Sequence, residues 1–242
     1  MRRSDEFRRL EFETGIQLHA AGSCLVKLGR THVLCSATLE DKVPAWMKGR
    51  TTGWLTAEYG MLPAATNTRS DREASRGKQQ GRTVEIQRLI GRSLRQAIDL
   101  AGLGERTLTV DCDVLNADGG TRCAAITGAW VAVALALKSR SLEAALVRQV
   151  AAVSAGIVES GEGRRGLVLD LEYEEDHRAA VDCNLVAARP ALGEGAGGDL
   201  MLVELQGTGE GRPFSRGEAD GLVDLGLTGC AALMEAQRAA LA

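Results

Sequence analysis

The segment Asp118-Gly-Gly-Thr-Arg122 has residue types suited to binding an anion. Paired glycines let successive backbone N–H groups turn toward one point, and the apolar run that follows predicts a helix whose positive end faces the same way. Thr121 can cap that helix, Gly120 and Thr121 offer backbone donors, and Arg122 adds a guanidinium fork for phosphate. The alternative is a tight turn with an ordinary helix cap. A Walker A loop is excluded, because no Lys-Ser or Lys-Thr pair follows the glycines.

A second cation stands at the start of another predicted helix. Gly81-Arg82-Thr83 precedes apolar residues at helical spacing, so the Arg82 guanidinium is expected near a second positive helix end. An anion between two such ends would be well held; the alternative is a solvated surface charge. The surrounding segment, residues 69–95, has eight basic and three acidic residues and could meet a polyanion.

Two acids, Asp176 and Asp182, flank a predicted tight connection between apolar strands at 167–173 and 181–185. Alternation places Asp182 and Asn184 on the strand face that leaves the core. A hard cation such as Mg²⁺ needs only one or two carboxylates plus phosphate oxygens, so the pair is a candidate metal site. The alternative is a pair of solvated acids at a hairpin tip.

Other patterns carry less chemistry. His19, His32 and His177 are scattered, and none has ligand spacing with another His or Cys. Residues 193–198 satisfy the spacing GxGxxG, but a strand pattern follows where a dinucleotide site needs a helix, so we predict a loop. The six cysteines form no CxxC pair and are interpreted as small buried hydrophobic residues.

Composition limits the class of protein. The chain has 242 residues, 45% hydrophobic and 25% charged, with a net charge of −3, which is typical of a globular protein and disfavours a general nucleic-acid-binding protein. No stretch approaches the roughly 20 uninterrupted apolar residues of a membrane span, and the start lacks the apolar segment of a signal peptide. We therefore expect a cytoplasmic protein without a membrane partner, folded as one domain over residues 1–242.

The elements that must position these residues follow from periodicity. Predicted strands cover 24–28, 33–37, part of 54–62, 108–114, 150–158, 167–173, 181–185 and 201–205. Predicted helices cover 86–101, 124–137, a segment from 142, and a last helix that starts at the capping box Ser215-Arg-Gly-Glu218 and runs to the C-terminus. This order predicts an α+β fold in which two halves share one core.

Seven segments resemble the ribonuclease PH family in the same order, over about residues 5 to 240. They are Gly53-Trp-Leu-Thr-Ala-Glu-Tyr-Gly-Met-Leu-Pro63, Gly81-Arg-Thr-Val-Glu-Ile-Gln-Arg-Leu-Ile-Gly-Arg92, Leu103-Gly-Glu-Arg-Thr107, Asp111-Cys-Asp-Val114, Ala117-Asp-Gly-Gly-Thr-Arg122, Tyr173-Glu-Glu-Asp176 and Glu204-Leu-Gln-Gly-Thr208. The resemblance implies a duplicated β-α fold of the ribosomal-protein S5 domain-2 type, with mixed sheets packed against helices. It also implies a ring built as a trimer of dimers, and phosphorolysis of RNA 3′ ends, chiefly those of tRNA precursors.

Residue by residue, the resemblance assigns two sets of positions. The family's phosphate site falls on Arg82, Gly120, Thr121 and Arg122, and its acidic, metal-associated positions fall on Asp176 and Asp182. Two departures from the family's pattern bear on RNA binding rather than on the reaction. Ala64 stands where the family commonly has an arginine, and the loops at 161–165 and 191–198 look expanded.

These observations predict a phosphate-dependent 3′→5′ exoribonuclease. Inorganic phosphate, the co-substrate, would attack the last phosphodiester, with Mg²⁺ near Asp176 and Asp182 and with Asp182 protonating the leaving oxygen. Arg69, Arg72 and Arg76 would steer the RNA backbone. The alternative is a non-catalytic RNA-binding subunit of an exosome-like ring, which the intact arginines and aspartates disfavour. Hydrolytic trimming would need a larger cluster of acids than this one pair.

Overall fold

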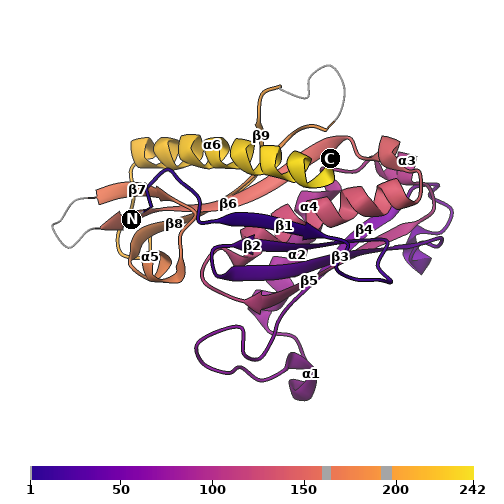
Figure 1. Ribbon diagram of the computed structural model, residues 1–242, viewed down its shortest axis with the longest axis horizontal. Helices are drawn as coiled ribbons and strands as arrows, with labels where there is room; N and C mark the ends of the chain where they lie inside the picture. Colours follow the sequence, from indigo (N-terminus) through magenta and orange to yellow (C-terminus); the bar gives the residue numbers. More distant parts are fainter. Residues whose placement is uncertain (1, 160–164, 192–197) are drawn as a thin grey trace.

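The first half of the chain forms a five-stranded mixed sheet (Figure 1). The computed structural model describes residues 2–159, 165–191 and 198–242. The first sheet consists of β1 (Leu10–Thr14), β2 (Gly22–Leu28), β3 (Thr31–Glu40), β4 (Trp54–Met61) and β5 (Thr107–Asn116) in the order β1-β2-β3-β5-β4. Strands β4 and β5 run parallel, and the other neighbours are antiparallel. Because β5 lies between β3 and β4, the loop that follows it leaves from an interior strand of the sheet.

The second half forms a four-stranded antiparallel sheet. It consists of β6 (Arg148–Glu159), β7 (Arg165–Leu169), β8 (Ala179–Pro190) and β9 (Met201–Thr208) in the order β7-β6-β8-β9. The side chains of Ser154, Asn184 and Gln206 are cross-strand neighbours on β6, β8 and β9. This row of polar residues lies on one face of the sheet.

Three long helices cover the sheets. They are α2 (Gly81–Arg95), which packs on β4, α4 (Thr121–Ser139), which contacts β2, β3 and β6, and α6 (Arg216–Leu241), which lies along β6 and β8 (Figure 1). The short helices are α1 (Glu73–Arg76), α3 (Leu100–Leu103) and α5 (Tyr173–His177), with 3₁₀ turns at Ala45–Met47 and Glu143–Ala145.

Helix α4 joins the two sheets into one core. Its buried residues cover all of its sides, and they share a hydrophobic cluster with Val150, Ala152 and Val186 of the second sheet. This helix is long and apolar enough to cross a membrane by length and composition alone, but most of it is buried inside the protein. Its apolar character is therefore explained by its place in the core.

Much of the predicted secondary structure is confirmed. The hairpin forms as β2 and β3, the strand within 54–62 forms as β4, and α6 begins at the predicted capping box, in which Ser215 and Glu218 bond each other's backbone. All six cysteines are buried and free, as expected. The 193–198 segment lies largely outside the described residues, so its predicted loop is not described, and the same holds for the 161–165 loop.

Three predictions were wrong. Only the 3₁₀ turn Glu143–Ala145 follows position 142, because Ser141 adopts a left-handed conformation with φ 54° and the chain turns directly into β6. Helix α2 ends at Arg95, short of residue 101, and a separate short helix follows after Asp99 caps it. The strands at 167–173 and 181–185 form no hairpin, since β6 lies between β7 and β8 and the connection contains α5.

Candidate active site

The glycine loop connects β5 to the start of α4. Gly119 and Gly120 have φ values of 80° and 66°, a backbone conformation that residues other than glycine rarely adopt. A Cβ atom on Gly119 would lie 2.4 Å from the carbonyl oxygen of Leu171, so this position has no room for a side chain. Gly120 is the residue that precedes the helix, and Thr121 is its first helical residue rather than its cap. The loop therefore presents backbone N–H groups at the positive end of α4.

The Thr121 hydroxyl is oriented by a tyrosine. The hydroxyl of Tyr59, on β4, donates to Thr121 Oγ1 over 3.0 Å. Burial raises the pKa of Tyr59, so the phenol keeps its proton and remains a donor. Since Thr121 Oγ1 accepts this bond, its own proton is available to another acceptor.

The two predicted phosphate-binding arginines lie on different helices. Arg82 is exposed in the first turn of α2, and within the described parts of the chain it makes no ion pair. Arg122 lies in the first turn of α4, where its Nη1 donates to Gln206 Oε1 over 3.1 Å and lies 3.6 Å from Glu85 Oε2. Both guanidinium groups act electrostatically on Asp176 and favour its ionised form. The prediction that Arg82 lies at a helix start is confirmed.

The two acids come from different elements. Asp176 belongs to α5, and Asp182 lies on β8, where the alternate residues Val181 and Cys183 are buried, as predicted. Burial raises the pKa of Asp176. Burial, and then the charge of Asp176, raises the pKa of Asp182 to about 6. Asn184 Nδ2 lies 3.4 Å from Asp182 Oδ2, and Asn184 Oδ1 accepts from the Cys123 thiol over 3.2 Å.

These residues meet around one pocket of about 300 Å³. Its lining includes Arg82, Gly120, Thr121, Arg122, Asp176 and Asp182. An adjoining pocket of about 420 Å³ shares Arg82, Arg122 and both acids, and adds Gln206, Thr208 and Glu210. The arrangement has a cationic wall made of two arginines and a helix end, and an acidic wall made of two carboxylates. It is suited to a phosphate group whose charge increases during a reaction.

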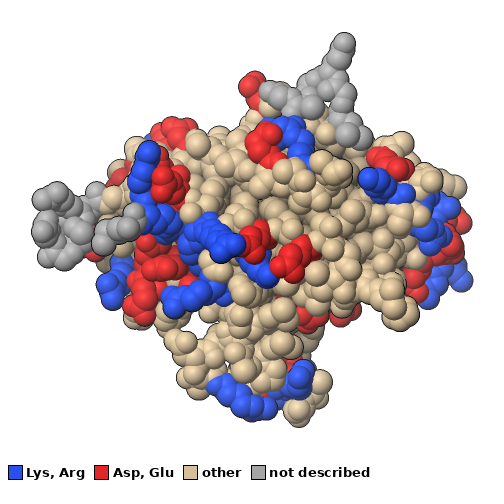
Figure 2. All heavy atoms as spheres, in the orientation of Figure 1, with Lys and Arg blue, Asp and Glu red and all other residues tan. Residues whose placement is uncertain are grey.

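The segment that carries the three predicted RNA-binding arginines projects from the body of the molecule (Figure 1), and Lys and Arg atoms gather at its tip (Figure 2). Arg69 Nη1 and Arg76 Nη2 lie 3.5 and 2.9 Å from the carboxylate of Asp71. Arg72 instead lines a hollow of about 700 Å³ that also contains Arg82. The structure therefore places Arg72 on a surface that leads to the pocket, whereas Arg69 and Arg76 lie beside it.

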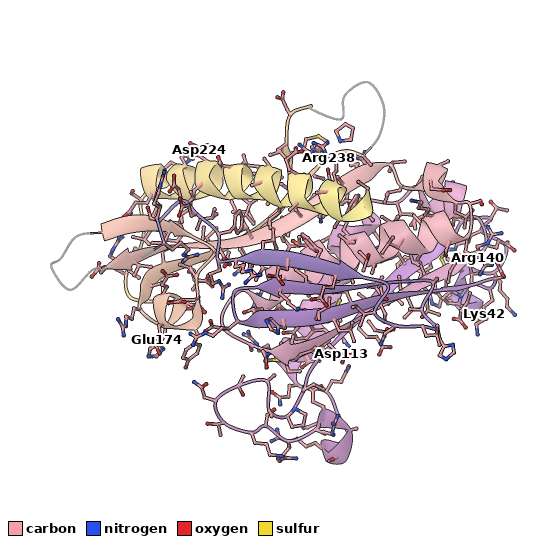
Figure 3. All side chains as sticks on the ribbon, in the orientation of Figure 1. Lys42, Asp113, Arg140, Glu174, Asp224 and Arg238 are labelled. Atoms are coloured by element: carbon pink, nitrogen blue, oxygen red, sulfur yellow. The ribbon has the colours of Figure 1, made fainter. Side chains whose placement is uncertain are left out.

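A second hollow, of about 710 Å³, adjoins the pocket at Tyr173 and Ala117. Glu174 also lines this second hollow, and Asp113 lines the first hollow, which contains Arg72. Both acids lie on the side of the molecule from which the α1 segment projects (Figure 3). Ala64, where the family commonly has an arginine, lines this second hollow. Its missing charge therefore concerns a surface beside the pocket.

Comparison with known proteins agrees with this geometry. A model of the 3′ exoribonuclease family, domain 1, matches residues 6–138. The ribonuclease PH of Roseobacter denitrificans (strain ATCC 33942 / OCh 114) is 52% identical over 246 residues, which cover 100% of this chain and 98% of that protein. The chain belongs to the ribonuclease PH family.

Solved structures show the same fold at lower identity. Rice (Oryza sativa) Rrp46 matches with a TM-score of 0.76 and 17% identity, over 100% of this chain and 98% of that chain. The Archaeoglobus fulgidus exosome with RNA bound to the active site matches with a TM-score of 0.75 and 22% identity, over 97% of this chain and 90% of that chain. The predicted α+β fold is confirmed, and membership of the ribonuclease PH family confirms the predicted class, a phosphorolytic 3′ exoribonuclease.

Sequence reasoning missed several residues at this candidate site. The Ser154 hydroxyl is buried, lines the pocket and has no hydrogen-bond partner among the described residues. Tyr59 and Gln206 orient Thr121 and Arg122. Ser154 and Gln206 could have been found as members of a polar row across strands, but only if the order β6-β8-β9 had been known.

Proposed function

We propose that this protein trims RNA 3′ ends with inorganic phosphate bound in the 300 Å³ pocket. The observation that carries the proposal is the meeting of six residues from four segments of the chain, which places a cationic and an acidic wall around one space. Arg82, Arg122 and the Gly120–Thr121 backbone hold the phosphate, and the Thr121 and Ser154 hydroxyls are available to its oxygens. The terminal phosphodiester of RNA lies between this phosphate and the acids.

The reaction transfers a nucleotidyl group without water. An oxygen of inorganic phosphate attacks the phosphorus of the terminal phosphodiester, the bond to the preceding 3′ oxygen breaks, and a nucleoside diphosphate is released. The two arginines stabilise the charge on the transferred group. Asp182, whose pKa is raised to about 6, can hold a proton near neutral pH and donate it to the leaving 3′ oxygen. The reverse reaction adds a nucleotide from a diphosphate.

The acidic wall also fits a magnesium ion. Asp176, Asp182, Asn184 and Glu210 line the adjoining pocket and offer the oxygen ligands that Mg²⁺ prefers. Within the described residues, no group of three or more His, Cys, Asp or Glu side chains is placed to hold a metal by itself. Asp176 would therefore hold Mg²⁺ together with phosphate oxygens of the substrate, and Asp182 would join it as a ligand when its carboxyl is ionised. The ion would supply positive charge beside the transferred phosphoryl group.

The RNA strand reaches the pocket along the projecting segment. Arg72 lines the hollow that leads to Arg82, and Arg69 and Arg76 add positive charge at the tip. The proposed substrates are tRNA precursors with 3′ extensions, and the proposed compartment is the cytoplasm. The proposed assembly is a hexameric ring of this chain, a trimer of dimers. A monomeric mass by light scattering at micromolar concentration would contradict it.

One assay separates this function from its alternatives. The wild-type protein is incubated with a 3′-extended RNA, with Mg²⁺, and with or without phosphate, and the nucleotide products are separated by chromatography. Phosphate-dependent release of nucleoside diphosphates is expected. Release of monophosphates at equal rate without phosphate would indicate hydrolysis. RNA binding with no product under either condition would indicate the non-catalytic ring subunit.

A further inference from the structure

A buried ion pair lies behind the glycine loop, outside the pocket. The side chains of Arg8 and Asp170 are 7% and 1% exposed. Arg8 Nε donates to Asp170 Oδ2 over 3.0 Å, and Arg8 Nη2 donates to Oδ1 over 2.7 Å. The backbone N–H of Arg8 also donates to Oδ2, over 2.9 Å. This geometry fixes the guanidinium in one orientation, as bidentate pairs do.

The remaining donors of Arg8 bind the carbonyl groups of the glycine loop. Nη1 donates to the carbonyl oxygen of Asp118, and Nη2 lies 3.4 Å from that of Gly119. Thr31 acts on the same two residues: its hydroxyl donates to the Gly119 carbonyl over 2.7 Å and accepts from the Asp118 N–H over 2.9 Å. Both carbonyls are therefore held on the side of the loop away from the pocket.

The bonds to the two carbonyl groups also set the direction of the N–H groups of the residues that follow them. The described chain has no cis peptide bond, and in a trans peptide the carbonyl of one residue and the N–H of the next point in opposite directions. Holding the carbonyls of Asp118 and Gly119 on Arg8 thus turns the N–H groups of Gly119 and Gly120 away from it, and the Gly120 N–H is one of the two proposed backbone donors to phosphate. Both glycines line the 300 Å³ pocket, whereas Arg8 lines a separate hollow with Arg2 and Glu175.

Asp170 connects the same cluster to the acidic wall. It adopts a left-handed backbone conformation with φ 56°, and its carbonyl oxygen accepts from Arg2 Nη1 over 2.7 Å. Arg2 also pairs with Glu175, the neighbour of Asp176 on α5. The chain segment after Asp170 packs against Gly119, which leaves no space for a Cβ atom there. Asp170 thus bonds Arg8, which holds the glycine loop, through its carboxylate, and Arg2, which pairs with α5, mainly through its backbone carbonyl.

We infer that Arg8, held by Asp170 and assisted by Thr31, is a positioning residue that presets the backbone of the phosphate-binding loop. Arg8 touches neither the pocket nor, in the proposed function on which this inference rests, the bound phosphate. Arg8 sets the direction of the loop N–H groups. Because these groups are already oriented before phosphate binds, binding requires no reorganisation of the loop. Loss of this bonding should weaken phosphate binding far more than RNA binding.

The test compares two buried arginines. Arg8→Lys keeps the charge beside Asp170 but loses the fork that reaches both carbonyls. Arg189→Lys is the control, because Arg189 is also buried, bonds Gln149 and pairs with Glu235, and lines none of the pockets around the site. For each protein, the melting temperature and the KM values for phosphate and RNA are measured in the phosphorolysis assay.

We expect Arg8→Lys to raise the phosphate KM about tenfold or more, with the RNA KM changed less than about twofold, because a bond from a charged donor to the loop is lost. Arg189→Lys should leave the phosphate KM unchanged, even where it lowers the melting temperature as much. Equal phosphate KM values in wild type and Arg8→Lys would overturn the inference. A wild-type protein that needs no phosphate would instead overturn the proposed function.

A second pair of variants, with smaller changes in side-chain structure, tests the inference if Arg8→Lys does not fold. Thr31→Val removes the hydroxyl that bonds both the Gly119 carbonyl and the Asp118 N–H, and it keeps the shape of the side chain. Thr107→Val is its control, since the Thr107 hydroxyl also donates to a backbone carbonyl, that of Lys42, in the same sheet. We expect about a 2- to 10-fold rise in phosphate KM for Thr31→Val only, the range for the one neutral hydrogen bond that holds the Gly119 carbonyl. No difference between the two variants would overturn the inference.

Discussion

The cationic and acidic walls of the pocket are built on different physical principles. The cationic wall consists of guanidinium groups and backbone N–H groups at the starts of α2 and α4, whose charge does not change near neutral pH. The acidic wall consists of two carboxylates whose pKa values are raised by burial, so its charge depends on pH. The first wall is suited to binding an anion, and the second to proton transfer or metal binding during the reaction.

This difference implies that changes in the two walls affect different kinetic parameters. Changes in the cationic wall should alter the phosphate requirement, because in the proposed function that wall contacts phosphate in the ground state. Changes in the acidic wall should alter turnover, because charge and protons are redistributed there in the transition state. The following variants test whether the two walls separate in this way.

The largest effect is expected for Asp182→Asn, which keeps the shape but removes the charge and the acid. Turnover should fall by about 10²-fold or more, the scale for losing one acid–base group, while RNA affinity hardly changes. Single-turnover rates and RNA binding by fluorescence anisotropy provide the measurement. Asp224→Asn, at an exposed position on α6 (Figure 3) that lines neither of the two pockets at the site, is the control. Near-normal turnover of Asp182→Asn in a correctly assembled protein would remove Asp182 from the catalytic residues.

Arg82→Ala should raise the phosphate KM at least tenfold, because it deletes a charge-assisted fork worth about 1.5–3 kcal/mol per hydrogen bond. Turnover at saturating phosphate should fall less than in Asp182→Asn. Arg88→Ala, exposed on the same helix and absent from the lining of the pocket, controls for loss of charge on α2. An unchanged phosphate dependence of Arg82→Ala would place Arg82 outside the site.

A smaller effect is expected when Arg69, Arg72 and Arg76 are all changed to Ala. RNA binding should weaken, and the salt dependence should flatten by about 0.7 in log–log slope for each lost phosphate contact. Phosphate KM should stay constant. The control is the double variant of Arg106 and Arg140, which share Asp41 just as Arg69 and Arg76 share Asp71. An unmoved salt slope in the triple variant would mean that the segment is structural.

The smallest effect is one of stability. The pKa of Asp182 is raised from 3.8 to about 6 in the folded protein, so the folded state binds a proton more tightly than the unfolded state. Its contribution to stability is fully present below pH 4 and is lost as pH rises through 6. Asp182→Asn, which never ionises, should therefore melt a few degrees higher than wild type at pH 8 and show no such gain at pH 4. An equal difference at both pH values would contradict the raised pKa.

The sequence was sufficient to predict the parts of the site that depend on local structure. Glycine pairs, helix starts and strand alternation are short-range signals, and they placed Gly120, Arg122, Arg82 and the outward face of Asp182. Helix α5 was missed because Glu172 caps it, where Ser, Thr, Asp or Asn is the usual signal. The missed helix then suggested a hairpin between strands that β6 keeps apart.

Long-range contacts were beyond the reach of these patterns. Arg8 and Asp170 are separated by 162 positions, and neither stands in a motif that would suggest its partner. Ser154 lies in a run of buried residues on β6 and shows its relation to the pocket only through its cross-strand neighbour Asn184. Such residues are found by knowing which strands are adjacent, which one sequence does not specify.

The central claim, that phosphate itself attacks the RNA chain, can be tested with phosphate labelled with ¹⁸O in all four oxygens. The protein is incubated with RNA and labelled phosphate, and the released nucleotides are analysed by mass spectrometry. The account predicts nucleoside diphosphates in which the terminal phosphate carries the label, including the bridging oxygen that made the attack. Unlabelled nucleoside monophosphates, with all label left in inorganic phosphate, would contradict it.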